Sequence, residues 1–302
     1  MVRMNSMPET ALRRHLEQTR VPLSLNNARD LGGVVLRDGR RVKKGLLLRT
    51  SRLFDATEED LRVLREDYGL SLIFDMREKE ELLRAPDPEI PGAKWVHTPV
   101  IDFDYLTEKL RSRPDRGDPP FDPKEFGHEK VLTWMIDSTR LGFQTGRSDL
   151  GIGGAYAGYL AGTVGRNSLG LFFRELAACE NGAALWHCHT GKDRTGIAAG
   201  LILDVLGADW DTILCDYEAS NLCFLDEIAE MEQLLRERGV EEEILPPVCG
   251  LVGVHSTMLE NAWAYMRRHW GGAEGYLIKR CGVSADELER LRRRLIEDGS
   301  GT

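Results

Sequence analysis

One junction in the sequence restricts the fold more than any other feature. The apolar run Ala183–His187 is typical of a buried strand, residues 188–191 are short and polar, and an apolar helical pattern extends from Asp193 to Leu206. This order places the loop at the carboxyl end of a strand and at the amino end of a helix. Unpaired backbone N–H groups and the helix dipole meet there, so the junction favours a bound anion.

Other segments alternate between strand and helix patterns along the chain. Helical spacing follows a capping-box sequence at Thr57 and again at Ser284. The alternation predicts an α/β fold in which a central sheet is flanked by helices. The predicted strands cover residues 45–49, 70–74 and 94–100, and the predicted helices cover residues 57–68, 155–179 and 284–296.

The 302 residues suit one large domain with short additions. We expect an N-terminal extension over residues 1–21, containing a polar and loosely attached helix, a main domain over 22–298, and a tail over 299–302. Residues 102–154 are rich in proline and charge and are too long for an ordinary loop, which predicts a partly helical, lid-like insertion. The Asp38-Gly39 dipeptide predicts a hairpin over residues 34–42.

Composition excludes several classes of protein. A formal charge of -9 repels polyphosphate backbones, so we expect no nucleic-acid partner. The most apolar segment, residues 196–208, is shorter than the ~20 residues of a spanning helix, and the first residues lack a secretory signal. The six scattered cysteines contain no Cys-x-x-Cys pair, which favours a reducing compartment. We expect a cytoplasmic protein, with export by a non-classical route left open.

The polar loop carries residues suited to phosphate chemistry. Cys188 is followed after five residues by Arg194, whose planar fork grips two phosphate oxygens at once. Gly191 removes a Cβ from a crowded turn. The helix dipole and a nearby cation lower the pKa of a cysteine, so we expect Cys188 to be an ionised nucleophile. Thr195 is placed to donate a hydroxyl hydrogen bond to the Cys188 sulfur.

A thiolate that displaces an alcohol from phosphorus needs a proton donor for the leaving oxygen. Asp193 lies inside the loop and is the first candidate. Asp75 ends one predicted strand, and Asp102 and Asp104 follow another, so all three could reach the same edge of the sheet. The residues alone do not choose among the four carboxylates.

Structural roles compete with functional ones around the loop. His187, Cys188 and His189 could ligate a metal, but adjacent side chains at a strand end point to opposite faces, which favours a supporting role for His187 and no metal. Asp75 could instead brace the loop as an ion pair with Arg77. Lys192 could be a solvated surface charge.

The full run from His187 to Gly196 resembles the cysteine-dependent protein tyrosine phosphatase superfamily. It is most similar to the bacterial tyrosine/serine phosphatase branch, whose His-Cys-x-x-Gly-Lys-Asp-Arg-Thr-Gly signature is matched at every fixed position. The resemblance covers residues 22–298. Further matching segments are Asn27–Gly33, Arg49–Leu53, Asp75–Arg77, Asp216–Tyr217 with Asn221, and the helix ending the domain.

The resemblance implies a tyrosine phosphatase-like α/β domain with a helical lid, a phosphocysteine intermediate, and neither a metal nor another cofactor. Asp193 is the proposed acid of this branch, and Lys192 resembles a loop lysine of phosphatases that accept phosphoinositides. By the same resemblance, the residues expected to bind the substrate phosphate are His189, Thr190, Gly191, Lys192, Asp193 and Arg194.

The sequence therefore predicts a protein phosphatase that hydrolyses phosphotyrosine, with phosphoserine and phosphothreonine as further substrates. Its expected partner is a phosphorylated protein or peptide. Two alternatives remain: a phosphoinositide phosphatase in which Lys192 binds a ring phosphate, and a phosphate-reading binding module with weak turnover. The presence of both Cys188 and Asp193 argues against the binding module.

Overall fold

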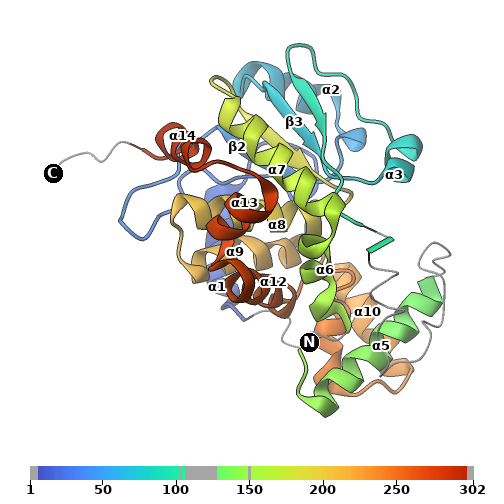
Figure 1. Ribbon diagram of the computed structural model, residues 1–302. Coiled ribbons are helices and arrows are strands. Elements are labelled where there is room, and N and C mark those ends of the chain that lie inside the picture. The colour runs from blue at the N-terminus through green and yellow to red at the C-terminus, as the bar shows by residue number, and fades with distance from the viewer. Residues whose placement is uncertain (1–5, 103, 106–127, 149–150, 298–302) are drawn as a thin grey trace.

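The computed structural model describes residues 6–102, 104–105, 128–148 and 151–297. Its strands are β1 (Arg29–Asp30), β2 (Leu47–Thr50), β3 (Leu72–Asp75), β4 (Lys94–His97) and β5 (Ala184–His187). They form one sheet in the order β1-β2-β5-β3-β4, in which only the edge strand β1 is antiparallel to its neighbour (Figure 1). The expected α/β fold with a central sheet is confirmed.

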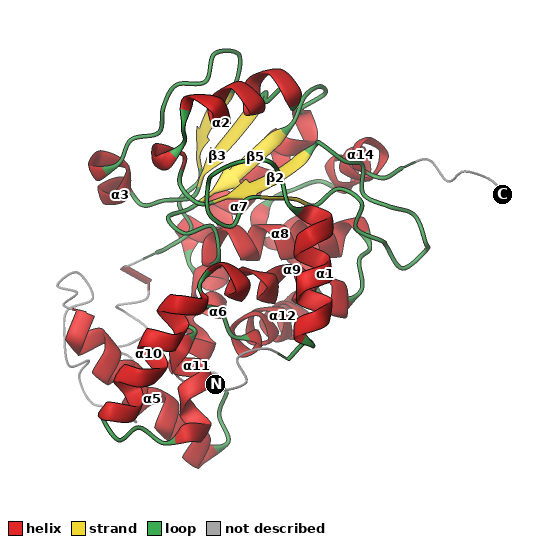
Figure 2. Ribbon diagram, turned by 180° about the vertical axis from the view of Figure 1, so that it is seen from behind, coloured by secondary structure: helices red, strands yellow, loops and turns green. Residues whose placement is uncertain are grey.

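Alternate residues of the inner strands face two separate apolar cores. Ile73 and Leu185 point to the side of α2, whereas Phe74 and Trp186 point to the side of α7 and α8. Figure 2 shows the strands between these two layers. Both faces are covered, which explains why the inner strands are apolar runs. The covering helices are α2 (Glu58–Arg62), the π-helical turn η2 (Val63–Asp67), α7 (Thr163–Ala178), α8 (Asp193–Leu206), α13 (Ala273–Cys281) and α14 (Ala285–Leu295).

The register of the parallel strands brings three chain segments to one edge. His187 at the end of β5 lies beside Thr50 of β2 on one side and Asp75 of β3 on the other. The residues that follow the three strands therefore meet at the carboxyl edge of the sheet. In doubly covered α/β sheets this edge is where ligands bind.

A second group of helices has a core of its own. Apolar side chains of α5 (His128–Thr145), α10 (Leu225–Glu237) and α11 (Leu245–Cys249) pack together. Figure 1 shows α5 and α10 side by side below the sheet. The helix α5 confirms that the 102–154 segment is partly helical, while residues 106–127 lie outside the described part of the chain. The remaining helices are α3 (Lys79–Arg84), α6 (Ala155–Ala161), α9 (Trp210–Glu218), α12 (Ser256–Trp270) and the short 3-10 turns η1 (Leu53–Asp55), η3 (Gly151–Gly154), η4 (Ala219–Cys223) and η5 (Glu242–Ile244).

The expected hairpin at residues 34–42 is present as a short one. The chain turns at Gly39, which has a φ of 85°, Val35 and Arg41 form an antiparallel bridge, and the Val42 N–H donates to the Val34 carbonyl at 3.0 Å. Val42 also bridges to Ile296, so the second arm additionally contacts the C-terminal segment. The tail at 299–302 lies outside the described residues.

The N-terminal helix α1 (Glu9–Thr19) is firmly packed, not loosely attached as expected. Its Leu12 side chain is fully buried, and the His15 Nε2 atom lies 3.3 Å from Asp216 Oδ1 on α9. Glu218 of α9 accepts backbone hydrogen bonds from Ser6 and Met7. The helix looks polar in sequence because only a narrow stripe of it is buried. Among the described residues, no helix is both long and apolar enough to cross a bilayer.

Truncation of Leu12 tests whether α1 belongs to the folded unit. We expect Leu12→Ala to lower the free energy of unfolding by about 2–5 kcal/mol, because it empties a fully buried site. The matched change Leu83→Ala, in a helix where the leucine is 76% exposed, should cost no more than about 0.5 kcal/mol. Urea denaturation measures both. Equal unfolding midpoints for the two variants would show that α1 is dispensable for stability.

Candidate active site

The loop after β5 requires glycine at one position. Gly191 has a φ of 71°, which side chains rarely adopt, and a Cβ there would lie 2.4 Å from the Thr50 carbonyl oxygen. The loop thus passes directly against the end of β2. This confirms the expected crowded turn and fixes the distance between the loop and the neighbouring strand.

Carbonyl groups of the loop point away from its centre. The Gly191 carbonyl accepts hydrogen bonds from Asn27 Nδ2 at 2.8 Å and from Arg49 Nη2 at 2.7 Å. The His189 carbonyl accepts from the backbone N–H of Arg52 at 3.1 Å. All of these donors lie outside the loop: Asn27 precedes β1, Arg49 is in β2 and Arg52 follows β2.

The N–H groups of the same peptide units face the interior of the loop. In a planar trans peptide the N–H of the next residue points away from the carbonyl. The N–H groups of Thr190 and Lys192 are therefore turned toward the interior of the loop. The amino end of α8, which begins at Asp193, adds its positive dipole end at the same place. This arrangement is an anion cradle.

A buried charge cluster lies beneath the loop. The carboxylate of Asp216 is 2.5 Å from Arg49 Nη1 and 3.7 Å from Arg29 Nε, and all three side chains are buried. Burial, followed by the charge of Arg49, lowers the pKa of Arg29 to about 10. Burial opposes ionisation of Asp216, but the two arginines outweigh it and hold its pKa far below the usual value. Two guanidinium groups against one carboxylate leave excess positive charge behind the cradle.

Cys188 stands at the start of the cradle and is 1% exposed. Burial alone would raise the pKa of its thiol, but the charge of Arg194 and hydrogen bonding by Thr195 outweigh burial, so the net pKa shift is downward. Within the described part of the chain, the buried Thr195 hydroxyl has no geometric hydrogen-bond partner, so it is free to turn toward the sulfur. Both features agree with the expected ionised cysteine.

Arg194 is oriented by a residue that the sequence analysis missed. Glu81 Oε2 lies 2.5 Å from Arg194 Nη1, and Glu81 Oε1 lies 2.9 Å from Nη2. A longer bond of 3.4 Å joins Nη1 to the Met76 carbonyl. Of the five guanidinium hydrogens, those on Nε and the second on Nη2 lie along one edge and suit a bidentate phosphate contact.

Glu81 is itself held by the start of α3. It is the third residue of a capping box, in which its Oε2 accepts the backbone N–H of Glu78 at 2.8 Å. The signal was present in the sequence as a Glu three residues after the helix boundary, close behind the Asp75–Arg77 segment. The sequence did not show that the same carboxylate also accepts hydrogen bonds from the arginine of a distant loop.

The four candidate proton donors occupy different positions in the structure. Asp193 begins α8, and its Oδ1 accepts a hydrogen bond from the Tyr156 hydroxyl at 2.7 Å. Asp102 caps α7 through the backbone N–H of Thr163, and Asp104 is exposed. Asp193 is thus the candidate that the structure places within the loop itself.

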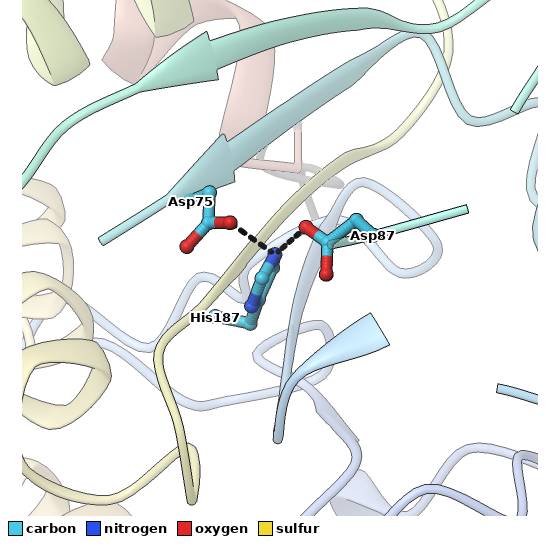
Figure 3. A group of neighbouring side chains, drawn as sticks. All are labelled: Asp75, Asp87 and His187. Carbon is cyan, nitrogen blue, oxygen red and sulfur yellow. Dashed lines mark ion pairs between the residues drawn. The ribbon is translucent and has the colours of Figure 1, made fainter. Parts of the chain in front are cut away.

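Asp75 belongs to a buried ion network behind the loop (Figure 3). Its Oδ2 lies 2.6 Å from Arg77 Nη2, and the same nitrogen is 2.8 Å from Asp87 Oδ1. His187 Nε2 is 2.9 Å from Asp87 Oδ2 and 3.9 Å from Asp75, while its Nδ1 lies 3.2 Å from the Cys188 carbonyl. Burial opposes protonation of His187, but the two carboxylates raise its pKa.

This network agrees with the structural role considered for Asp75, in which an ion pair with Arg77 supports the loop. Asp75, Asp87 and His187 offer three atoms close enough to hold a metal ion. The guanidinium of Arg77, however, already lies between the two carboxylates and pairs with both of them. A metal would have to displace a fully buried arginine, so the donor set suits support of the loop better than metal binding.

Lys192 and His189 occupy contrasting positions. Lys192 is 5% exposed, and its Nζ donates at 2.7 Å to both the Leu251 and Gly253 carbonyls and lies 3.5 Å from Asp193 Oδ2. It is therefore not a solvated surface charge. The His189 ring is half exposed at the loop surface, and burial and then the charge of Arg52 lower its pKa. His189 contributes its backbone to the loop, and its lowered pKa favours the neutral ring.

The buried cysteine and its loop lie at the carboxyl edge of an α/β sheet, between the parallel strand β5 and the helix α8. Comparison with known proteins identifies the family: residues 22–297 match the model of the tyrosine phosphatase family, and the chain belongs to that family.

Individual relatives cover most of the chain. A tyrosine-protein phosphatase of Cupriavidus necator is 28% identical over 271 residues, covering 88% of this chain and 85% of the relative. The triple specificity protein phosphatase PtpB of Mycobacterium tuberculosis is 27% identical over 285 residues, covering 88% and 95%. A tyrosine-protein phosphatase of Nostoc commune is 29% identical over 254 residues, covering 82% and 72%.

The hydroxyl of Thr195 provides a test of the charge on Cys188. We expect Thr195→Val to raise the pH midpoint of Cys188 alkylation by roughly one unit, because a thiolate loses a hydrogen-bond donor. Iodoacetamide labelling read by peptide mass spectrometry measures the midpoint. Thr50→Val, which removes a hydroxyl bonded to the Asn26 carbonyl, serves as the control. An unchanged midpoint in Thr195→Val would exclude the hydrogen bond as a cause of the lowered pKa.

Proposed function

We propose that this phosphatase hydrolyses phosphotyrosine in proteins and peptides, with phosphoserine and phosphothreonine as further substrates, through a phosphocysteine at Cys188. The observation that carries the proposal is a buried cysteine at the amino end of α8, in a loop whose Gly191 carbonyl is held outward by Asn27 and Arg49. The charge of Arg194, which lowers the pKa of this thiol against the effect of burial, agrees with it. A sulfur this deeply placed is reached most easily by a phosphoryl group on a long, rigid side chain such as tyrosine. The names of the relatives in Cupriavidus and Nostoc support the same substrate.

The reaction proceeds in two displacements. The Cys188 thiolate attacks phosphorus, the P–S bond forms, and the ester P–O bond breaks. Asp193 gives its proton to the leaving oxygen, while Arg194 and the inward N–H groups hold the other phosphate oxygens. Water then attacks the phosphocysteine, its proton passes to Asp193, and inorganic phosphate leaves. Thr195 stabilises the departing thiolate, and His187 and Asp75 support the loop from behind.

Hydrolysis of phosphoinositides is supported less by the contacts of Lys192 than by its position in the sequence signature. The Lys192 ammonium group, which would bind a ring phosphate, already donates to two backbone carbonyls. A second phosphate would have to replace both bonds. These two bonds connect the loop to the segment at residues 251–253.

Replacement of the nucleophile tests the first displacement. Cys188→Ser should lose roughly a thousandfold or more of its activity on an aryl phosphate in the presence of chelator, since a serine hydroxyl is a far weaker nucleophile. Acid-quenched wild-type enzyme should carry a phosphoryl adduct on the Cys188 peptide. Cys215→Ser, at a half-buried cysteine whose pKa is raised to about 11, is the control and should retain full activity. Wild-type turnover by Cys188→Ser would remove this sulfur from the reaction.

The acid is tested by leaving-group dependence. Asp193→Asn should slow phenyl phosphate by roughly a hundredfold and 2,4-dinitrophenyl phosphate by much less, because only the poor leaving group needs a proton. The exposed Asp104→Asn variant should match wild type on both esters. Steady-state rates at matched pH measure the ratio. A uniform loss on both substrates would assign Asp193 a structural role.

A further inference from the structure

Two buried tyrosines stand behind the proposed acid. The Tyr156 hydroxyl of α6 donates to Asp193 Oδ1 at 2.7 Å, and the Tyr217 hydroxyl of α9 donates to the Tyr156 oxygen at 2.9 Å. Their rings meet edge to face at 6.1 Å between centroids. The sequence analysis gave neither tyrosine a role in the site. The contact joins three helices at the carboxylate.

The geometry makes Tyr156 a directed donor. Both phenols are almost completely buried, and burial followed by the charge of Asp193 raises the pKa of each far above the ordinary value, so both keep their proton. A neutral phenol has one hydrogen to donate. Because the Tyr156 oxygen already accepts from Tyr217, the Tyr156 hydrogen is aimed at Asp193.

This contact distinguishes the two oxygens of the carboxyl group. A proton on Oδ1 would point at the Tyr156 hydrogen, and two donors facing one another repel. The other oxygen, Oδ2, has only the Lys192 ammonium group at 3.5 Å among its described ionic neighbours. The transferable proton is thus better placed on Oδ2.

We propose that Tyr156, held by Tyr217, is a positioning residue of the phosphatase reaction that directs the transferable proton of Asp193 to Oδ2. The inference rests on the proposed role of Asp193 as the acid. When the ester P–O bond breaks and the P–S bond forms, the proton leaves Oδ2 for the departing oxygen. The carboxylate that remains is stabilised by the Tyr156 hydrogen bond, which strengthens as the charge develops.

Two measurable consequences follow for Tyr156→Phe. Loss of a donor to the charged carboxylate should move the basic limb of the pH profile of kcat/KM to higher pH by roughly one unit. It should also slow phenyl phosphate by roughly tenfold while leaving 2,4-dinitrophenyl phosphate nearly unchanged. Tyr217→Phe should show the same pattern to a smaller degree, because it acts through Tyr156.

Tyr276→Phe is the matched control. This buried tyrosine donates to the Leu160 carbonyl of α6 at 2.8 Å, so its loss perturbs the same helix without touching Asp193. It should leave the pH limb and the ratio of the two substrates at wild-type values. If Tyr156→Phe and Tyr276→Phe have the same pH profile and the same ratio, the proposal is wrong.

A double variant separates this inference from the function on which it rests. In an Asp193→Asn background, Tyr156→Phe should cost nothing further on phenyl phosphate, because the group through which it acts is gone. Full additivity of the two losses would overturn the positioning role. If Asp193→Asn itself shows no leaving-group dependence, the proposed acid fails instead. Thermal melting of each variant confirms that the compared enzymes are folded.

Discussion

The conformation of the Cys188 loop depends on one buried guanidinium group. Arg49 lies at the centre of β2, donates to the Gly191 carbonyl, and pairs with Asp216 of α9. A charge at this depth is tolerated only when it is paired and hydrogen-bonded, so the loop carbonyl and the carboxylate must both be in place. His15 of α1 closes the cluster from the far side. One ion pair therefore joins the sheet, the loop and two helices.

Local patterns in the sequence predicted the parts of the site that one segment forms by itself. The strand, the loop and the helix from Ala184 to Leu206 appear as expected, because apolar runs and a glycine turn act over a few residues. The partners that orient the loop could not be predicted in this way. Glu81 and Arg194 are 113 residues apart in the chain, and Tyr156 and Asp193 are 37 apart. Only the strand register and helix packing bring them together.

The features that the sequence left wrong, incomplete or open have a common physical origin. The helix α1 exposes most of its residues, so its composition hides the single stripe that holds Leu12. The hairpin at residues 34–42 forms, but the local pattern does not show that its second arm also pairs with Ile296. For Lys192 a surface charge stayed open as an alternative, because nothing near it in sequence supplies the two carbonyls that it meets. In each case tertiary contacts add what a local pattern does not contain.

Glu81 binds both the start of α3 and Arg194, so the loop depends on the connection between β3 and α3. The carboxylate reaches Arg194 only because α3 begins where it does, a few residues after β3 ends. Each residue of an α-helix turns by about 100°, so a single insertion or deletion ahead of Glu81 would swing its side chain away from the loop. All eight fixed positions of the signature could then be intact in a protein whose loop arginine is no longer oriented by Glu81. A chain whose loop arginine is oriented in this way must therefore keep the length of this connection as well as the signature.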